Sequence, residues 1–485
     1  MQAVASQPRA FRTSSLAQTQ INAQLPAVRA KLDTYGPARR SAAPLQAPPS
    51  FMVDGRKVVF GDILKVDSSV VFDVAAHRST VKAVIELELP EKGEPVIELV
   101  PRATKVVLDG KEIDPASYSD VPDPAKESHF RIVGAELTPG RHRVEVEYVL
   151  TEGTRYSGDS VELFTSKSDL DDRSMDEQFF PTNLEYDQYP GSVTFEIRGT
   201  EAKHSVMTNG EVSEVDGKFV VTFPPYFNTA SRYLNVINPT RFAITEGTYQ
   251  GINGPIPITV YAPNNNLVDG ENPALLGLKE RLRPGPRNAA QQALTPAATV
   301  ERGLEIAKAA LAKHEKDIGP YPHSRLLIRV SGSGGMEYSG AIESDLSSIP
   351  HELHHQWFAR SAQPANGNAG WIDEAVASWH DNGYPTSKQP PYSPQKLSGF
   401  PPWHRITPEA AYTHGAKIMA YLDSVFATKG GLRPVLAKFF EANKNGLFTT
   451  ETFLAFVKEH GQGLNFDFDA FFKAQVYDTN LLRWA

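Results

Sequence analysis

The sequence predicts an α+β protein with several domains, in which an N-terminal all-β domain of sandwich or saddle type precedes a domain of mixed strands and helices. Short segments rich in β-branched residues, separated by turns that contain glycine, fill residues 51–245. Longer helical patterns become frequent only beyond about residue 270. The 485 residues suffice for roughly two to four domains, each with a core of its own.

We divide the chain into an N-terminal arm rich in Ala, Pro and Gln (1–50), a β domain (51–245) and a second domain (246–485). In the β domain, Val81–Leu87 and Val144–Leu150 alternate apolar and polar residues with a period near two, which is typical of half-buried strands. Turns are predicted at four dipeptides: Asp109-Gly110, Pro139-Gly140, Asn209-Gly210 and Asp216-Gly217.

The second domain is expected to open with a strand at Gly254–Pro263. Pro296–Ile318 has the pattern of a long amphipathic helix, and Leu326–Val330 that of a buried strand. The proline-rich segment Pro385–Pro402 must form a loop, because proline interrupts both helices and central strands.

The sequence HELHH, which begins at His351, is the most informative motif of the chain. Positions i and i+4 share one face of a helix, so the imidazoles of His351 and His355 can bind the same ion. Glu374, after eighteen intervening residues, supplies a third ligand and leaves one position open, as in catalytic zinc sites. Two imidazoles and a carboxylate favour zinc over copper or magnesium, so we expect one Zn²⁺ per chain. No proline lies within His351–Arg360, which predicts an unbroken helix there.

Three further motifs accompany HELHH: GGMEY at 334–338, WIDEAVA at 371–377 and YTHGA at 412–416. Their order resembles the gluzincin aminopeptidases of peptidase family M1, the family of alanyl aminopeptidase and leukotriene hydrolase. The resemblance covers about residues 51–485 and is strongest from about residue 300. It implies that the second domain is a thermolysin-like zinc metallopeptidase domain. It also implies a short form of the family, without the long helical C-terminal domain of larger members.

The motif and the resemblance together assign the catalytic roles. Glu352, beside the first zinc ligand, is expected to act as the general base, and Tyr412 to donate its hydroxyl to the oxyanion of the transition state. Tyr384 is the alternative for this tyrosine, because Tyr412 follows Glu374 more closely than is usual in the family. His354 lies off the ligand face and is expected to pack rather than bind metal. Asp373 is expected either to orient a ligand histidine or to place charge at a helix N-terminus.

The resemblance assigns substrate binding to GGMEY. Glu337 would pair with the free α-amine of a peptide, and the residues before it would lie close to the peptide backbone: Gly334, Gly335 and Met336. Two departures concern specificity. Tyr338 stands where the family usually has asparagine, and the β-domain glutamine that helps to bind the amine has no clear match, with residues 164–166 and Gln178 as candidates.

The leading functional prediction is a zinc-dependent aminopeptidase that hydrolyses the N-terminal bond of peptides. Two alternatives remain open: a zinc hydrolase of the same fold with a modified or specialised peptide substrate, and a non-catalytic peptide-binding protein. The preferred N-terminal residue and the oligomeric state are not readable from the sequence.

Composition excludes several other classes. The net charge is −8 and basic residues are dispersed, so no nucleic-acid partner is expected. No apolar run approaches the roughly 20 residues that a membrane span requires. The chain has no cysteine, hence no disulfide and no thiolate zinc ligand. Residues 1–50 lack a signal-peptide core, and the protein could be cytoplasmic or exported with its leader removed.

Overall fold

The computed structural model describes residues 47–114, 119–120, 127, 129–170, 173–184, 187–264, 294–332 and 334–478. Apart from residues 47–50, the predicted N-terminal arm lies outside the described residues.

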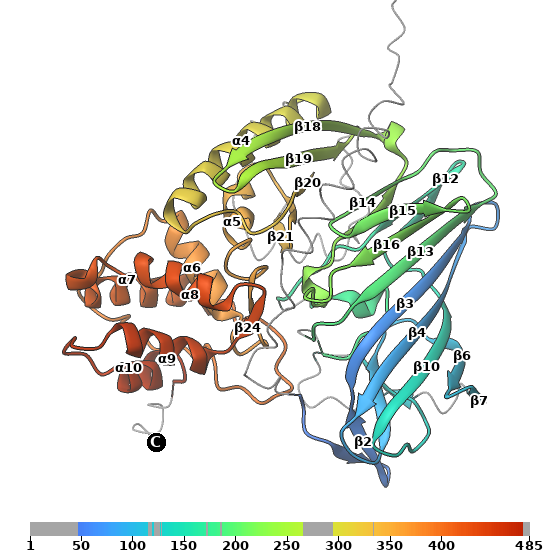
Figure 1. The fold of residues 1–485 in the computed structure, drawn as a ribbon, viewed down its shortest axis with the longest axis horizontal. Helices are drawn as coiled ribbons and strands as arrows, with labels where there is room; N and C mark the ends of the chain where they lie inside the picture. Colours follow the sequence, from blue (N-terminus) through green and yellow to red (C-terminus); the bar gives the residue numbers. More distant parts are fainter. Residues whose placement is uncertain are drawn as a thin grey trace, which may run out of the picture. The chain divides into compact units, whose positions relative to one another are not determined.

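The β-rich part of the chain, which we call the β lobe, extends from β1 to β17 (residues 51–237). An eight-stranded sheet forms its centre (Figure 1). Its strands, in spatial order, are β15 (Glu211–Val215), β16 (Lys218–Phe223), β13 (Gly191–Arg198), β3 (Asp62–Asp73), β4 (Arg78–Leu89), β10 (Gly140–Val149), β6 (Ala103–Leu108) and β7 (Lys111–Ile113). Every second residue of β4 is buried, from Ser79 to Leu89, as the period-two pattern predicts. Residues Val81–Leu87 lie in β4 and Val144–Val149 in β10, so both predicted strands are confirmed.

Two smaller sheets complete the β lobe. The five-stranded sheet contains β1 (Phe51–Val53), β2 (Arg56–Phe60), β5 (Glu94–Glu98), β9 (Phe130–Ile132) and β8 (Ser119–Asp120). The four-stranded sheet contains β11 (Thr154–Ser157), β12 (Ser160–Phe164), β17 (Leu234–Ile237) and β14 (Ser205–Thr208). Asp216-Gly217 joins β15 to β16 with φ values of 51° and 73°, the left-handed geometry of a tight hairpin turn.

The sheet beside the candidate site is a mixed five-stranded one. In spatial order it contains β18 (Phe242–Gly251), β19 (Gly254–Pro263), β20 (Leu326–Val330), β22 (Ala341–Ser344) and β21 (Gly335–Tyr338). The predicted strands at 254–263 and 326–330 are confirmed, and GGMEY forms the edge strand β21. β18 spans the predicted domain boundary at residue 245 and pairs along its whole length with β19.

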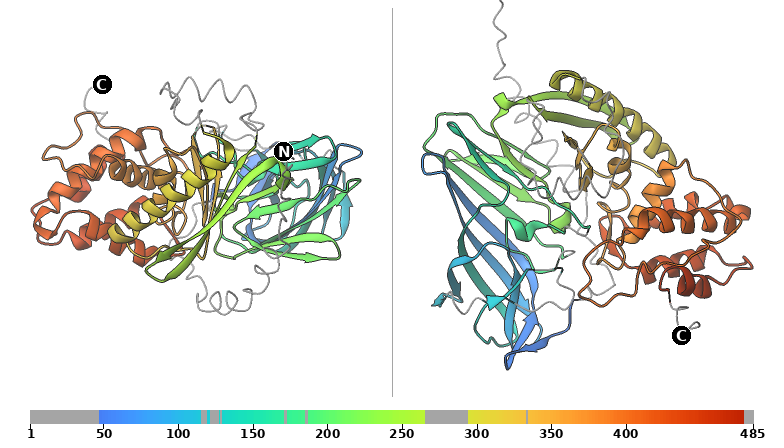
Figure 2. Two further views of the ribbon diagram at one scale, coloured as in Figure 1. Left: turned by 90° about the horizontal axis from the view of Figure 1, so that it is seen from above. Right: turned by 180° about the vertical axis from the view of Figure 1, so that it is seen from behind.

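Helix α4 (Pro296–Asp317) confirms the predicted amphipathic helix and lies along β18 and β19 (Figure 2). The side chain of Thr295 caps it by accepting a hydrogen bond from the backbone nitrogen of Ala298, and Pro296 occupies the first turn. Gly303 permits close packing, because a Cβ there would lie 3.1 Å from a methyl group of Val260.

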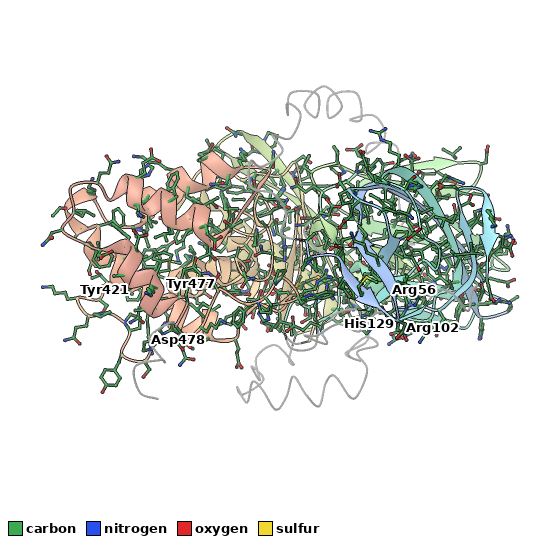
Figure 3. The ribbon with its side chains drawn as sticks, turned by 90° about the horizontal axis from the view of Figure 1, so that it is seen from below. Arg56, Arg102, His129, Tyr421, Tyr477 and Asp478 are labelled. Carbon is green, nitrogen blue, oxygen red and sulfur yellow. The ribbon has the colours of Figure 1, made fainter. Side chains whose placement is uncertain are left out.

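Short helices make up the C-terminal part. They are α5 (Ile349–His354), α6 (Trp371–Asp381), a π-helical turn (Ala411–Gly415), α7 (Ala416–Val425), α8 (Arg433–Asn443), α9 (Thr450–His460) and α10 (Phe468–Gln475). The two-stranded pair β23 (Ala362–Pro364) and β24 (Gly446–Phe448) lies among them. Tyr421, labelled in Figure 3, packs against the ring of Phe471 at 5.3 Å and so joins α7 to α10. Residues 385–402 form no helix or strand, which confirms the predicted loop.

The prediction of an unbroken helix over His351–Arg360 is wrong. α5 ends at His354, and the next residues turn through hydrogen bonds to carbonyls three residues back. The side chain of Gln356 explains the turn, because its oxygen accepts a hydrogen bond from the backbone nitrogen of Gly340 at 2.8 Å. This buried tertiary contact outweighs a helical pattern that contains no breaker residue.

No helix among the described residues is long and apolar enough to cross a membrane.

Candidate active site

Three side chains from α5 and α6 bring their donor atoms together. His351 Nε2 lies 3.1 Å from His355 Nε2, and the two nitrogens lie 3.3 and 3.5 Å from Glu374 Oε2. A tetrahedral zinc ion with ligand bonds of about 2.0–2.1 Å separates its ligand atoms by roughly 3.3–3.4 Å. Glu374 Oε2 is buried and accepts no hydrogen bond within the described part of the chain. The donor types and their spacing therefore fit a zinc ion.

A carboxylate that sequence reasoning missed holds the first histidine. His351 Nδ1 lies 2.6 Å from Asp381 Oδ2, and the other Asp381 oxygen lies 3.0 Å from His380 Nδ1. Burial lowers the pKa of His351, but its interactions with the carboxylates of Asp381 and Glu374 outweigh burial and raise it well above its ordinary value. Asp381 follows Glu374 by seven residues, two turns along the same face of α6, and this spacing was a usable signal.

Asp373 lies near the second histidine. Ligand-type atoms of Glu337, His355 and Asp373 all lie within 4.8 Å of one another. One Asp373 oxygen accepts a hydrogen bond from the backbone nitrogen of Glu374 at 2.9 Å. Asp373 thus lies near His355, a candidate ligand, and also interacts with the first turn of α6, so its position is compatible with both predicted roles.

Tyr412 is in contact with Glu374, one of the three candidate zinc ligands. Its hydroxyl donates a hydrogen bond to Glu374 Oε1 at 2.6 Å. The π-helical turn that carries it packs closely on α6, where a Cβ at Gly415 would lie 2.7 Å from the Cβ of Ala375. Tyr384, the alternative, packs its ring against Trp379 and His380 instead.

Glu352 lies against the glycine-led edge strand β21. A Cβ built on Gly335 would lie 1.9 Å from Glu352 Oε1, so the carboxylate occupies space that only glycine leaves free. Burial raises the pKa of Glu352 to about 8. The positive charge of His351 opposes this increase, and the negative charge of Glu337 strengthens it. Gly334 has a φ of 70°, a left-handed conformation that favours glycine.

Glu337 forms an ion pair with an arginine that sequence reasoning also missed. Arg360 Nη2 lies 2.7 Å from Glu337 Oε1, and Arg360 Nε donates to the backbone oxygen of Glu337 at 2.9 Å. Both side chains are buried. Met336, beside Glu337, belongs to a buried core cluster with Tyr261, whereas Gly334 is partly exposed and Gly335 is exposed.

The β lobe contributes an acid that the sequence prediction did not include. Asp169 accepts a hydrogen bond from Thr407 Oγ1 at 2.8 Å. Burial raises the pKa of Asp169 to about 7, and the carboxylates of Glu337 and Glu374 add to the shift. By contrast, Thr165 in the candidate segment 164–166 donates its hydroxyl to the Leu234 carbonyl inside the β lobe.

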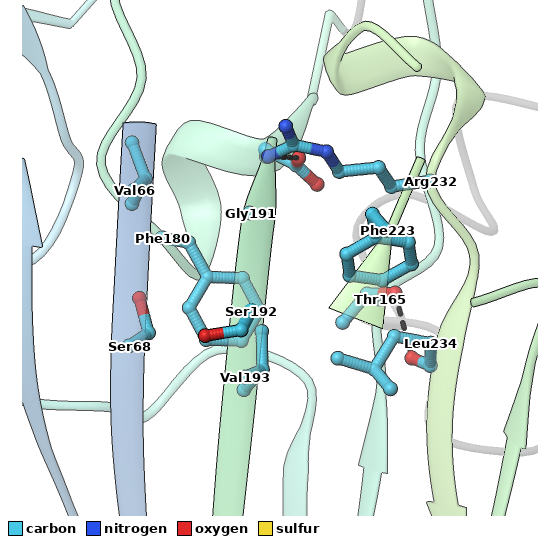
Figure 4. Close-up of a pocket in the computed structure, with 11 residues that line it drawn as sticks. Val66, Ser68, Thr165, Phe180, Gly191, Ser192, Val193, Phe223, Arg232 and Leu234 are labelled. Carbon is cyan, nitrogen blue, oxygen red and sulfur yellow. Dashed lines mark hydrogen bonds and ion pairs between the residues drawn. The ribbon is translucent and has the colours of Figure 1, made fainter. Parts of the chain in front are cut away.

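His354 packs as the sequence predicts. It is buried, and its ring stacks on those of His380 and Phe358, with centroids 4.9 and 5.8 Å apart. A small pocket in the β lobe, next to Asp176, Ser192 and Arg232, has none of the three ligand residues in its lining (Figure 4).

No protein-family model and no curated protein sequence matches the chain. Among solved structures it is similar to an M1 zinc metallopeptidase from Deinococcus radiodurans, with a TM-score of 0.54 and 15% identity over 86% of this chain and 94% of that one. It is similar to Legionella pneumophila aminopeptidase A with a TM-score of 0.59 and 13% identity, over 86% of this chain and 49% of that one. It is also similar to native yeast LTA4 hydrolase, with a TM-score of 0.57 and 15% identity over 91% of this chain and 70% of that one. The chain thus has the fold of M1 zinc metallopeptidases, with a sheet-rich N-terminal part and a helical C-terminal part.

The metal site yields a direct prediction. Replacing His355 by Ala removes one of three converging donors, and we expect elemental analysis to find most of the zinc lost. His354→Phe is the matched control, because it keeps a ring in the neighbouring packing position and should keep about one zinc per chain. Full zinc occupancy in His355→Ala would contradict the ligand assignment.

The contact between His351 and Asp381 yields a second prediction. Asp381→Asn keeps the shape of the side chain but weakens the acceptor that orients the ligand ring. Loss of such an outer carboxylate costs about 10–100-fold in metal affinity. Titration with a competing chelator should show this decrease, and an unchanged zinc affinity would mean that Asp381 does not support the ligand.

Proposed function

We propose that the protein is a zinc-dependent aminopeptidase that hydrolyses the N-terminal bond of peptides. The observation that carries this proposal is the convergence of His351, His355 and Glu374, with donor atoms 3.1–3.5 Å apart, beside a buried Glu352. A protein that only binds peptides has no need of a buried carboxylate next to a ligand set, which disfavours the non-catalytic alternative. The M1-type fold supports a hydrolase, and we assign residues 246–485 to a thermolysin-like catalytic domain and residues 51–245 to the β domain.

Each side chain has a defined task in the proposed reaction. A zinc ion bound here would polarise water and the scissile carbonyl. Glu352 accepts a proton from the attacking water and transfers it to the leaving amine. Tyr412 donates its hydroxyl to the oxygen on which negative charge develops.

Glu337 is proposed to fix the position of the N-terminus. It lies on the edge strand β21, and its carboxylate is within 4.8 Å of ligand-type atoms of His355 and Asp373. A substrate ammonium paired with Glu337 would hold the first peptide bond near the zinc ligands. A mutant of the Deinococcus radiodurans enzyme was solved with the substrate Tyr-Ser-Ala, and this supports peptides as the substrate class.

A second candidate function is favoured by Arg360. Its guanidinium already pairs with Glu337 at 2.7 Å and offsets the charge that a free α-amine would otherwise meet. A site compensated in this way discriminates less strongly against peptides whose N-terminus is blocked or modified. The second candidate is therefore a zinc hydrolase of the same fold with a specialised peptide substrate.

One experiment separates the two functions. Wild-type protein is assayed on amino-acid p-nitroanilides and on their N-acetylated counterparts, with and without a metal chelator. The aminopeptidase proposal expects strong preference for free amines and loss of activity with the chelator. Equal rates on both substrate types support the second function, and hydrolysis that the chelator leaves unchanged contradicts both.

The general base is tested by Glu352→Gln. The change removes the proton acceptor but keeps the shape and the zinc ligands, and loss of a general base typically lowers the rate about 10²–10⁴-fold. The measurement is kcat together with zinc content. A wild-type rate in the zinc-loaded variant would show that the assigned mechanism is wrong.

The amine site is tested by Glu337→Gln, which keeps the shape of the side chain beside Arg360. Loss of a buried charged partner costs roughly 2–5 kcal/mol. For peptides with free N-termini, we expect kcat/KM to fall by the factor that corresponds to this free energy. N-acetylated peptides should change far less. If both substrate types lose activity equally, Glu337 serves only as a structural partner of Arg360.

A further inference from the structure

The segment of residues 403–409, which we call the strap, connects the proline-rich loop to the π-helical turn of Tyr412. It forms no helix or strand of its own up to Thr407. Its first residues contact the β lobe, and its last ones adjoin the candidate active site.

Trp403 anchors the strap in an aromatic cluster of the β lobe. Its ring lies 5.1 Å from that of Phe51, 5.7 Å from Phe60 and 5.9 Å from Phe130, in edge-to-face arrangements. Trp403 is buried in this cluster although it lies more than 270 residues beyond Phe130 in the chain. Edge-to-face aromatic pairs of this kind stabilise a cluster beyond the burial of their apolar area.

Arg405 forms a second anchor. Its guanidinium pairs with the buried carboxylate of Glu98 in β5 at 3.0 Å and lies over the ring of Phe130. The backbone nitrogen of Arg405 donates a hydrogen bond to Glu127 at 2.5 Å. Arg405 and Glu98 are both buried, and Glu98 also lies 3.4 Å from Arg173, so displacing Arg405 would separate its buried guanidinium from a carboxylate that two arginines share.

The strap also runs directly across the start of α6. A Cβ on Gly367 would lie 2.9 Å from the His404 carbonyl, and a Cβ on Gly370 would lie 2.5 Å from Thr407 Oγ1. Thr407 also makes two hydrogen bonds to Asp169 of the β lobe. Its backbone nitrogen donates to the Asp169 carbonyl at 2.9 Å, and its hydroxyl donates to the Asp169 carboxylate at 2.8 Å. The strap is thus held between the β lobe and the first residues of the helix that carries Glu374.

Tyr412 follows within five residues of Thr407, and its hydroxyl lies 2.6 Å from Glu374 Oε1. Backbone hydrogen bonds tie this short connection together, since the nitrogens of Ala411 and Tyr412 donate to the carbonyls of Pro408 and Glu409 at 2.8 and 3.3 Å. We propose that the strap positions Tyr412 for catalysis, so that Trp403 and Arg405 are positioning residues by which the β lobe takes part in the reaction. This inference rests on the proposed function, in which Tyr412 donates to the developing oxyanion.

The test uses the full-length protein loaded with zinc and the p-nitroanilide substrate. Trp403→Leu loosens the aromatic anchor, and Arg405→Lys keeps the charge but removes the planar guanidinium, in case the first variant folds poorly. Phe195→Leu is the matched control, because it removes an aromatic ring stacked on Phe72 in the core of the same lobe, away from the strap.

We expect both strap variants to lower kcat by about ten-fold or more with little change in KM, because a small misplacement of a catalytic group is costly. Amide hydrogen exchange over residues 408–416 should accelerate while zinc content stays constant. In the Tyr412→Phe background the same substitutions should change kcat by less than about two-fold, since effects that act through one group are not additive. Phe195→Leu should lower the melting temperature without changing kcat.

The outcomes separate the strap from the proposed function. Equal losses of kcat in the wild-type and Tyr412→Phe backgrounds overturn the positioning role and leave the function intact. Loss of kcat in Phe195→Leu similar to that in Trp403→Leu also overturns it, because the effect is then one of general stability. A wild-type rate in Tyr412→Phe alone overturns both the role of Tyr412 and the inference that depends on it.

Discussion

The buried carboxylate of Glu374 is the group on which the geometry of the candidate site depends. A carboxylate inside a protein requires charged or hydrogen-bonding partners, because its transfer from water is costly. Its oxygens meet the imidazoles of His351 and His355 on one side and the hydroxyl of Tyr412 on the other. Burial acts to raise its pKa, but the two histidines hold it well below the ordinary value. Two helices and the π-helical turn therefore meet at one side chain.

The site has more buried acids than fixed cations. Burial raises the pKa of Asp169, with Glu337 and Glu374 adding to the shift, and burial also raises the pKa of Asp373. Arg360 offsets one carboxylate directly. A divalent cation held by His351, His355 and Glu374 would offset part of the remaining charge, and a substrate ammonium would offset a further part. The excess of buried carboxylates over cations thus favours the binding of positively charged groups at adjacent points of the site.

Local patterns were sufficient to predict much of the fold and of the ligand set. Period-two alternation identified the long strands, and the spacing within HELHH identified the histidines whose nitrogens come within 3.1 Å. The early end of α5 could not be read in this way, since it depends on a contact between Gln356 and a distant turn. Arg360 and the strap were missed for the same reason, because their roles come from partners far away in the sequence. Asp381, by contrast, lies seven residues after Glu374 on the same face of α6, a spacing that the sequence itself shows.

Tyr338, which follows Glu337 on the edge strand β21, has a structural role. Tyr338 is fully buried, its hydroxyl accepts a hydrogen bond from the backbone nitrogen of Lys167, and its ring packs 4.8 Å from that of Tyr233. The next carbonyl, that of Ser339, accepts a hydrogen bond from Asn209. The strand that carries Glu337 is therefore fixed at its end by residues of the β lobe. Because the side chain of Tyr338 is buried in packing, selection for a peptide N-terminus would, under the proposed function, depend on the balance of charge around Glu337.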